Sequence, residues 1–197
     1  MIETVLFVPS APMLLPEYVG AADPAAEMRE LCVRTLRESL AGVDRVVIAA
    51  DDRPPTVGGW TGEPLGLRVG RHLLELAGWT GPVTVGAVDD PGGGPTAYVV
   101  VGDGSAKRSE RAPGHLDQRA FDVDATILRA LGSADTAALS GLDPALCDEL
   151  LVTAAAPLGR AAYVLRDRTD LAGEVLWSGD PYGVLYWVAR WTTPSTA

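Results

Sequence analysis

The sequence predicts an α/β domain of three layers, in which helices cover both faces of a mostly parallel or mixed central sheet. Two observations predict this fold. Apolar segments of strand length alternate with amphipathic helical segments in the first half of the chain. The segment RVVIAA at 45–50 is apolar throughout, as a strand covered on both faces should be. At 197 residues the chain is expected to fold as one domain over 1–197.

The N-terminal elements are a strand at 3–8 and an amphipathic helix at 24–41. Asp23 is expected to cap this helix, with Pro24 at its first position, where a missing N–H costs nothing. The strand at 45–50 then follows. The predicted core side of the helix consists of Leu31, Val33, Leu36 and Leu40.

The middle of the chain predicts a long Pro- and Gly-rich loop at 53–65, a helix at 66–78 and strands at 83–88 and 97–102. The glycine-rich segment DDPGGGP joins the two strands. No helix follows it that could point its N-terminus at a phosphate, so we interpret it as a hairpin or a crossover rather than as a nucleotide site.

The last third of the chain predicts several helices and two closing strands. Helical patterns run from residue 117 to about 166 and include LDQRAFDVDATILRAL and DPALCDELLVTA. Strands are expected at 173–178 and 184–191, joined by SGDPYG. Because both alternating faces of the final strand are apolar, we expect it inside the sheet or beneath a partner.

Composition narrows the classes of function. The net charge of −10 argues against nucleic-acid binding, which needs lysine and arginine to neutralise phosphates. The start MIETVLFVPS has no basic region, and Pro9 interrupts its apolar run, so neither a signal peptide nor a membrane span is expected. Cys32 and Cys147 lack metal-type spacing and are expected to be buried thiols in a reducing compartment. These features predict a cytoplasmic protein.

Familiar catalytic motifs are absent. The segment GDGSAK does not have the glycine spacing of a P-loop, and the chain contains no Gly-x-Ser-x-Gly nucleophile elbow. Only two histidines are available for metal chemistry. His72 is flanked by leucines in a predicted helix, whereas His115 follows a strand end in a loop from which it could reach a pocket.

Asp51 and Asp52 end the buried strand at 45–50, where the carboxyl ends of parallel strands form the usual ligand crevice. One of these carboxylates could bind a metal, accept from a substrate hydroxyl or act as a base with a raised pKa. Equally, one could cap the following turn while the other is solvated.

Asp103 and Ser105 follow the strand at 97–102 and carry the same ambiguity. Lys107 and Arg108 are interpreted either as holders of an anion or as surface charge. Together, these strand ends predict a crevice, but the residue types alone do not determine its chemistry.

Four segments resemble the class III extradiol dioxygenase (LigB-type) superfamily, in the same order over nearly the whole length. They are VPSAPMLLPE, VVIAADD, VVVGDGSAKRSERAPGHLDQRAFDVD and PYGVLYWVARW. More closely, the chain resembles the short actinobacterial LigB-like proteins of unassigned role. The resemblance implies a crevice in which Fe(II), held by two histidines and a glutamate, opens catechol-type rings with dioxygen, assisted by a further histidine.

This chain departs from that pattern at every iron-site position that can be matched. Ser10 stands in place of the first ligand histidine, Asp52 in place of the second, and Ala106 in place of the acid/base histidine. No glutamate occurs between Leu150 and Gly173, where the ligand glutamate is expected. Hydroxyl and methyl groups cannot replace imidazole on Fe(II), so we expect dioxygenase activity to be lost and no cofactor to be held.

Two hypotheses follow. In the first, the chain is a LigB-like pseudoenzyme that binds a small molecule or assists a partner, with homodimerisation or pairing with another subunit implied by the resemblance. In the second, it is an enzyme of hydrolase or lyase type with a replaced acid/base or carboxylate metal site for Mg(II), Mn(II) or Ca(II), to which Glu17 could contribute. A residual ring-cleaving dioxygenase is the remaining alternative. The candidate catalytic residues are Asp52, Asp103 and His115, and the candidate binding residues are Ser10, Asp51, Ser105 and Lys107.

Overall fold

The computed structural model describes residues 1–19, 23–51, 62–86 and 94–194. It confirms the predicted α/β class, with strands and helices in nearly the predicted order. The strands are β1 (Ile2–Val8), β2 (Arg45–Ala50), β3 (Val83–Val85), β4 (Thr96–Val101), β5 (Ala172–Gly179) and β6 (Tyr186–Thr192). The helices are η1 (Pro12–Leu14), η2 (Pro16–Tyr18), α1 (Ala26–Ser39), α2 (Leu65–Leu76), α3 (Arg119–Ser133), α4 (Thr136–Ser140), α5 (Pro144–Glu149) and α6 (Ala155–Val164).

The described strands form one mixed sheet in the order β3-β2-β4-β1-β6-β5. Strands β1 to β4 are parallel, whereas β6 runs antiparallel to β1 and to β5. The final strand therefore lies inside the sheet, as its two apolar faces predicted. Because β3 and β4 both run parallel to β2, the segment between them is a crossover and not a hairpin.

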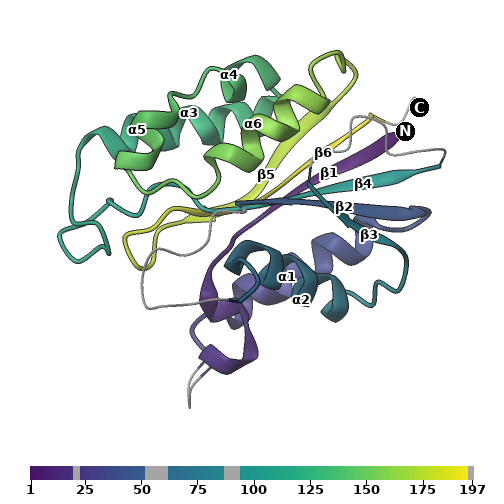
Figure 1. Ribbon diagram of the computed structural model, residues 1–197, viewed down its shortest axis with the longest axis horizontal. Helices are drawn as coiled ribbons and strands as arrows, with labels where there is room; N and C mark the ends of the chain where they lie inside the picture. Colours follow the sequence, from purple (N-terminus) through teal and green to yellow (C-terminus); the bar gives the residue numbers. More distant parts are fainter. Residues whose placement is uncertain (20–22, 52–61, 87–93, 195–197) are drawn as a thin grey trace.

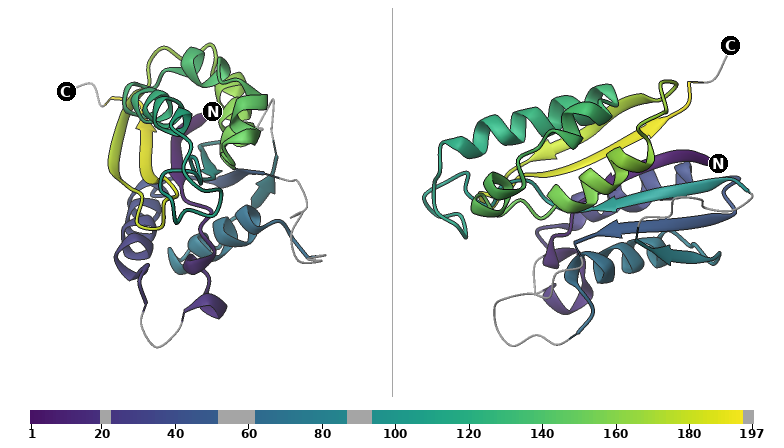
Figure 2. Two further views of the ribbon diagram at one scale, coloured as in Figure 1. Left: turned by 90° about the vertical axis from the view of Figure 1, so that its left-hand side faces the viewer. Right: turned by 45° about the horizontal axis from the view of Figure 1, so that its top comes forward.

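Helices cover both faces of the sheet, with α1 and α2 on one side and α3 to α6 on the other (Figures 1 and 2). The period of two along β1 sends Leu6 and Val8 toward the α1 and α2 side and Phe7 toward the opposite core. Cys32 and Cys147 are buried and free, as predicted. Among the described residues, no helix is both long enough and apolar enough to cross a bilayer.

Adjacent strands β1 and β4 are followed by connections that leave toward opposite faces of the sheet. The chain after β1 leads to α1, and the chain after β4 leads to α3 on the other side (Figure 1). In open α/β sheets such a reversal opens a crevice beyond the carboxyl ends of the strands, where ligands usually bind. The residues that follow Val8 and Val101 therefore lie where proteins of this sheet type usually bind ligands.

The predicted start of the first helix was wrong. Helix α1 begins at Ala26 with Ala25 as its N-cap, and no side chain caps it. Asp23 instead accepts from the Ala25 N–H and forms an ion pair with Arg29. The buried face of the helix therefore differs from the predicted one. Leu36 and Leu40 are buried as predicted, whereas Leu31 and Val33 are only half-buried. The other buried residues of this helix are Met28, Cys32 and Thr35.

Two other elements are shorter than predicted. Strand β3 ends at Val85, because Gly86 adopts a positive φ of 110° that leaves the extended region. The helix expected over DPALCDELLVTA ends at Glu149, and Leu151 adopts a φ of 59°. The turn formed there places the residues before α6 against the end of β4, which shapes the site described next.

Candidate functional site

Two hydrogen bonds join the carboxyl ends of β1 and β4 at the point where the connections diverge. The Ser10 N–H donates to Asp103 Oδ1 at 2.7 Å, and the Ser10 hydroxyl donates to Oδ2 at 2.6 Å. Both residues are buried, at 6% and 8% exposure. The carboxylate of Asp103 is therefore engaged through both of its oxygens by a single serine.

Thr153, from the turn before α6, completes this arrangement. Its Oγ1 accepts from the Asp103 N–H at 2.8 Å and lies 3.3 Å from the Ser10 hydroxyl oxygen. The close packing requires glycine at position 102, since a Cβ there would lie 2.6 Å from Ala154 Cα. Gly102 therefore allows Ala154, the residue before α6, to pack directly against the end of β4.

Tyr186 brings a phenol to the same place from β6. The antiparallel register pairs Phe7 with Ala189, so Tyr186, the first residue of β6, lies near the carboxyl end of β1 and within electrostatic reach of Asp103. Tyr186 is only 3% exposed as a residue, and its hydroxyl, which keeps some contact with solvent, makes no hydrogen bond to any described residue. We refer to Ser10, Asp103, Thr153 and Tyr186 as the strand-end set.

The electrostatics of the strand-end set reflect its burial. Removal from water raises the pKa of Asp103 to about 6, and the hydrogen bonds from Ser10 oppose part of this rise. Burial raises the pKa of the Tyr186 hydroxyl, and the negative charge of Asp103 raises it further. The carboxylate is the ionised partner at neutral pH, and the phenol stays protonated beside it.

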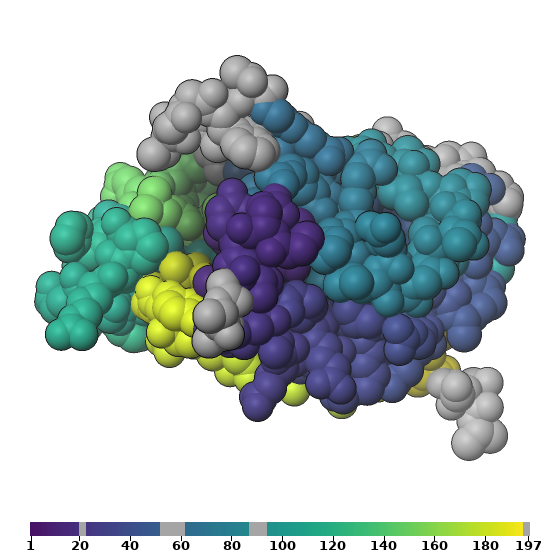
Figure 3. Space-filling model, turned by 90° about the horizontal axis from the view of Figure 1, so that it is seen from below, coloured from purple at the N-terminus to yellow at the C-terminus, as the bar shows by residue number. Residues whose placement is uncertain are grey.

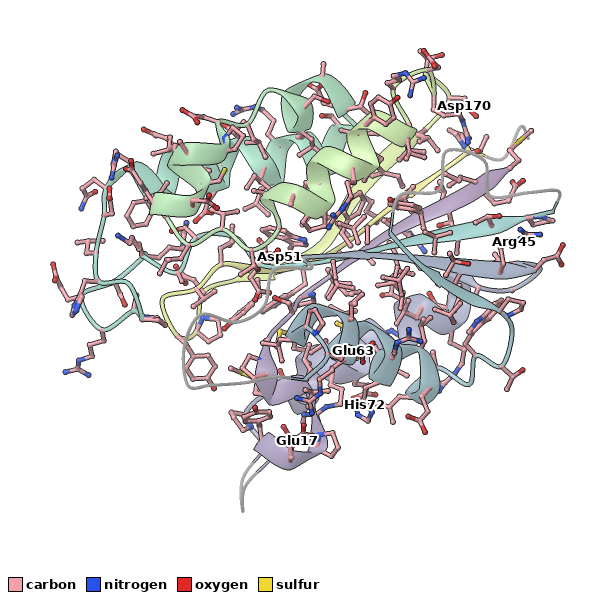
Figure 4. The ribbon with its side chains drawn as sticks, in the orientation of Figure 1. Glu17, Arg45, Asp51, Glu63, His72 and Asp170 are labelled. Carbon is pink, nitrogen blue, oxygen red and sulfur yellow. The ribbon has the colours of Figure 1, made fainter. Side chains whose placement is uncertain are left out.

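The end of β2 forms the next part of this edge. Arg160 from α6 donates to the carbonyl of Ala50, the last residue of β2. Asp51 follows, half-buried, at the end of the sheet opposite Arg45 (Figure 4). Asp52, which was predicted to be catalytic, lies outside the described residues.

Two predicted binding residues are engaged elsewhere. The Ser105 hydroxyl is fully buried, donates to the Leu150 carbonyl at 3.0 Å and accepts from the Lys107 N–H at 3.1 Å. The Lys107 side chain lies against Gly114, where a Cβ would be 2.6 Å from Lys107 Cγ. Among the described contacts, neither side chain reaches Asp103, and both hold the loop after β4 in shape.

The remaining candidates are also apart from the strand-end set. His115 is exposed in a loop with a φ of 58°. Glu17 is exposed and forms an ion pair with Arg68, near His72 and away from Asp51 (Figure 4). Within the described ranges, no group of three or more histidine, cysteine or acidic side chains is arranged to hold a metal ion.

A buried ion pair supports the loop, and sequence reasoning missed it. Asp124 of α3 is 1% exposed, accepts from the Ser105 N–H at 2.8 Å and pairs with Arg108 at 2.8 Å. Arg108 also contacts Asp180 at 2.8 Å, in the turn before β6. A signal was present, since Asp124 stands between Ala120 and Ile127 in the apolar stripe of its helix.

The strand-end set provides two hydroxyls, a buried carboxylate and a phenol, which are suited to hydrogen bonding and to proton transfer. None of these groups is the imidazole donor on which non-haem Fe(II) chemistry relies. Neither a scan of the chain against protein-family models nor a search of curated protein sequences returned a match.

Proposed function

We propose that this chain is a LigB-type protein that binds a small, hydroxyl-bearing molecule at the strand-end set without iron. The proposal is supported by the four segments that resemble the superfamily in order. The observation that carries it is the pair of hydrogen bonds from Ser10 to Asp103, at 2.7 and 2.6 Å. They occupy the place where the resemblance expects the first iron-binding histidine.

The chemistry of that pair does not suit Fe(II). A neutral serine hydroxyl is a poor ligand, and this one directs its proton to Asp103. Both carboxylate oxygens accept from Ser10, so metal binding would have to compete with these bonds. Ala106 offers no donor where the acid/base histidine is expected. The simplest interpretation of these residues is that the chain has lost the iron site and has kept the crevice.

Tyr186 supports ligand binding. The Tyr186 hydroxyl forms no hydrogen bond with any described residue, and it is not fully buried, so it can still reach solvent. It lies within electrostatic reach of Asp103 and is available to a polar group of a ligand. A ligand hydroxyl placed between them would donate to the carboxylate and accept from the phenol. An anionic group there would be repelled by Asp103.

The test uses metal-free protein and a panel of small hydroxyl-bearing molecules, including catechol and phenol, monitored by saturation-transfer NMR. We expect at least one of them to bind the wild type, and Tyr186→Phe to weaken its binding by about 2- to 10-fold, as loss of one hydrogen bond implies. Tyr163→Phe is the matched control, because Tyr163 is an exposed tyrosine of α6. Absence of binding across the panel, or equal binding by the Tyr186 variant, contradicts the proposal.

A second candidate function is proton-transfer catalysis of hydrolase type. It is favoured by the 2.6 Å hydrogen bond from the Ser10 hydroxyl to a carboxylate whose pKa is raised to about 6 by burial. Asp103 would accept the Ser10 proton as the hydroxyl attacks an ester carbonyl. The ester C–O bond would break and the alcohol would leave with that proton, and water would then hydrolyse the acyl-serine and restore Ser10. Hydrolysis of p-nitrophenyl acetate, rising with pH through about 6 and abolished in Ser10→Ala and Asp103→Asn, is expected of this candidate. Rates equal to buffer in all three proteins leave only the binding function.

Pairing with a second copy or with another subunit is proposed from the resemblance alone. Sedimentation velocity over a range of protein concentrations measures it directly. A mass that stays at the monomer value of 20.6 kDa would exclude self-pairing.

A further inference from the structure

A groove separates α1 from the end of β5 and the turn that follows it. Its volume is about 450 Å³, which is within the range of small-molecule sites. Met13, Met28, Trp177 and Tyr182 line it, and Glu27 and Glu30 of α1 are at its rim. On this face of the molecule the turn before β6 lies beside the segment that follows β1 (Figure 3). We call this feature the α1 groove.

The walls of the α1 groove are fixed by specific contacts. Arg29 donates to the carbonyls of Met13 and Leu14 at 2.7 and 3.2 Å and pairs with Asp23, so it clamps the segment after β1 to α1. On the opposite side, the Trp177 ring lies against Gly179, where a Cβ would be 2.9 Å from Trp177 Cζ2. The groove is therefore formed in advance of any ligand.

The lining combines aromatic faces with negative charge. Trp177 is half-buried and Tyr182 is 42% exposed, so both rings present area to the groove. Glu27 and Glu30 are exposed and form no ion pair with any described residue. Arg34 is the one cationic side chain among the described residues of the lining. Aromatic rings and carboxylates around one pocket favour an organic cation.

We propose that the α1 groove binds a small organic amine, with its apolar body against Trp177 and Met28 and its ammonium group between the rings and the glutamates. This site is distinct from the strand-end set, although the two are neighbours, since Met13 and Tyr182 line the groove and lie within four positions of Ser10 and Tyr186 in the chain. The net charge of −10 reinforces the selection, because it disfavours anions over the whole surface.

The experiment compares three probes of similar size and different charge: benzylamine, benzyl alcohol and benzoate. Each is titrated to about 20 mM into ¹⁵N-labelled protein, and the indole N–H signal of Trp177 is followed, after assignment with Trp177→Phe. We expect a saturable shift with benzylamine. Affinity for benzyl alcohol and benzoate should be at least about threefold weaker, because neither carries the positive charge.

The variants separate this site from others. Glu27→Gln combined with Glu30→Gln should weaken benzylamine binding by about threefold or more, whereas Glu38→Gln, on α1 but outside the groove, should not. Because all these substitutions are on exposed positions, the fold should persist, and circular dichroism verifies it. Tyr186→Phe, which tests the strand-end set, should leave benzylamine binding unchanged. No saturable shift, equal binding of benzoate or benzyl alcohol, or an unaffected glutamate variant would overturn the proposal.

Discussion

Ser10 and Asp103 are 93 positions apart in the sequence and are joined by two hydrogen bonds across the ends of adjacent strands. The Ser10 backbone fixes one carboxylate oxygen and its side chain fixes the other. This relationship ties β1 to β4 at the place where the connections of the fold reverse direction, and it gives the site a single buried charge.

The buried charge of Asp103 predicts a pH dependence of stability. Its pKa of about 6 in the folded protein exceeds the value of about 4 expected for an unfolded chain. The folded state therefore binds the proton more tightly, so this site gains stability as the pH falls through 6 toward 4. Asp103→Asn lacks this gain. Urea unfolding should therefore show wild type improving relative to Asp103→Asn between about pH 7.5 and pH 5.

Asp117→Asn is the matched control for that experiment. Its hydrogen bonds with Arg119 lower the pKa of Asp117 to about 2, so its titration contributes only below about pH 4. The difference between wild type and Asp117→Asn should stay constant from about pH 7.5 to pH 5. If the difference in unfolding free energy between wild type and Asp103→Asn were also constant over this pH range, the pKa of Asp103 would not be raised in the folded protein, which contradicts the prediction.

Asp124 and Asp180 both form ion pairs with Arg108, and their replacement by alanine should differ greatly in its cost to protein stability. Asp124→Ala removes a buried carboxylate and leaves Arg108 and the Ser105 N–H without it, which should cost about 3–5 kcal/mol. Asp180→Ala removes the exposed partner of the same guanidinium and should cost at most about 1 kcal/mol. Chemical denaturation of both variants measures the contrast, and similar losses would refute the assignment of Asp124 as the anchor.

Two glycines of neighbouring segments should respond to alanine with opposite signs. Gly102→Ala places a methyl group 2.6 Å from the backbone of Ala154 and should cost about 1–3 kcal/mol. Gly159→Ala, within α6, meets nothing within 4 Å and should stabilise the protein by up to about 1 kcal/mol through helix propensity. Thermal unfolding reports both. Stabilisation by Gly102→Ala would show that the strand end does not pack against the start of α6.

His115 is predicted to matter through its backbone conformation. At a φ of 58° a β-branched residue is strained, so His115→Val should lose about 1–2 kcal/mol while His115→Gly should not be destabilising. Since His115 is exposed, neither variant should alter binding of the hydroxyl-bearing panel. Loss of that binding in His115→Gly would instead support the prediction that His115 is a site residue.

The sequence predicted the sheet class and the order of nearly all elements, because these depend on hydrophobic periodicity and on the short polar segments at strand ends. It placed Ser10 and Asp103 among the candidates from two separate motifs. It could not predict that they bind each other, since sheet order decides which strand ends are adjacent, and the order β2-β4-β1 is not encoded in any local pattern.

Errors and omissions share the same origin. Ser105 and Lys107 were candidates because of their position, but the turn at Leu151 determined that the Ser105 hydroxyl bonds to Leu150. Tyr186 was overlooked because its strand is apolar on both faces, and its significance appears only when Asp103 is placed beside it. Asp124 was visible as an acid within an apolar stripe, a pattern that indicates a buried, paired charge.

Anaerobic titration of the protein with Fe(II), by calorimetry and followed by oxygen uptake with catechol, tests the central claim most directly. The bonds between Ser10 and Asp103 predict no binding tighter than about millimolar and no oxygen consumption above the free metal. One equivalent of Fe(II) bound at micromolar affinity, with catechol cleaved, would contradict the account.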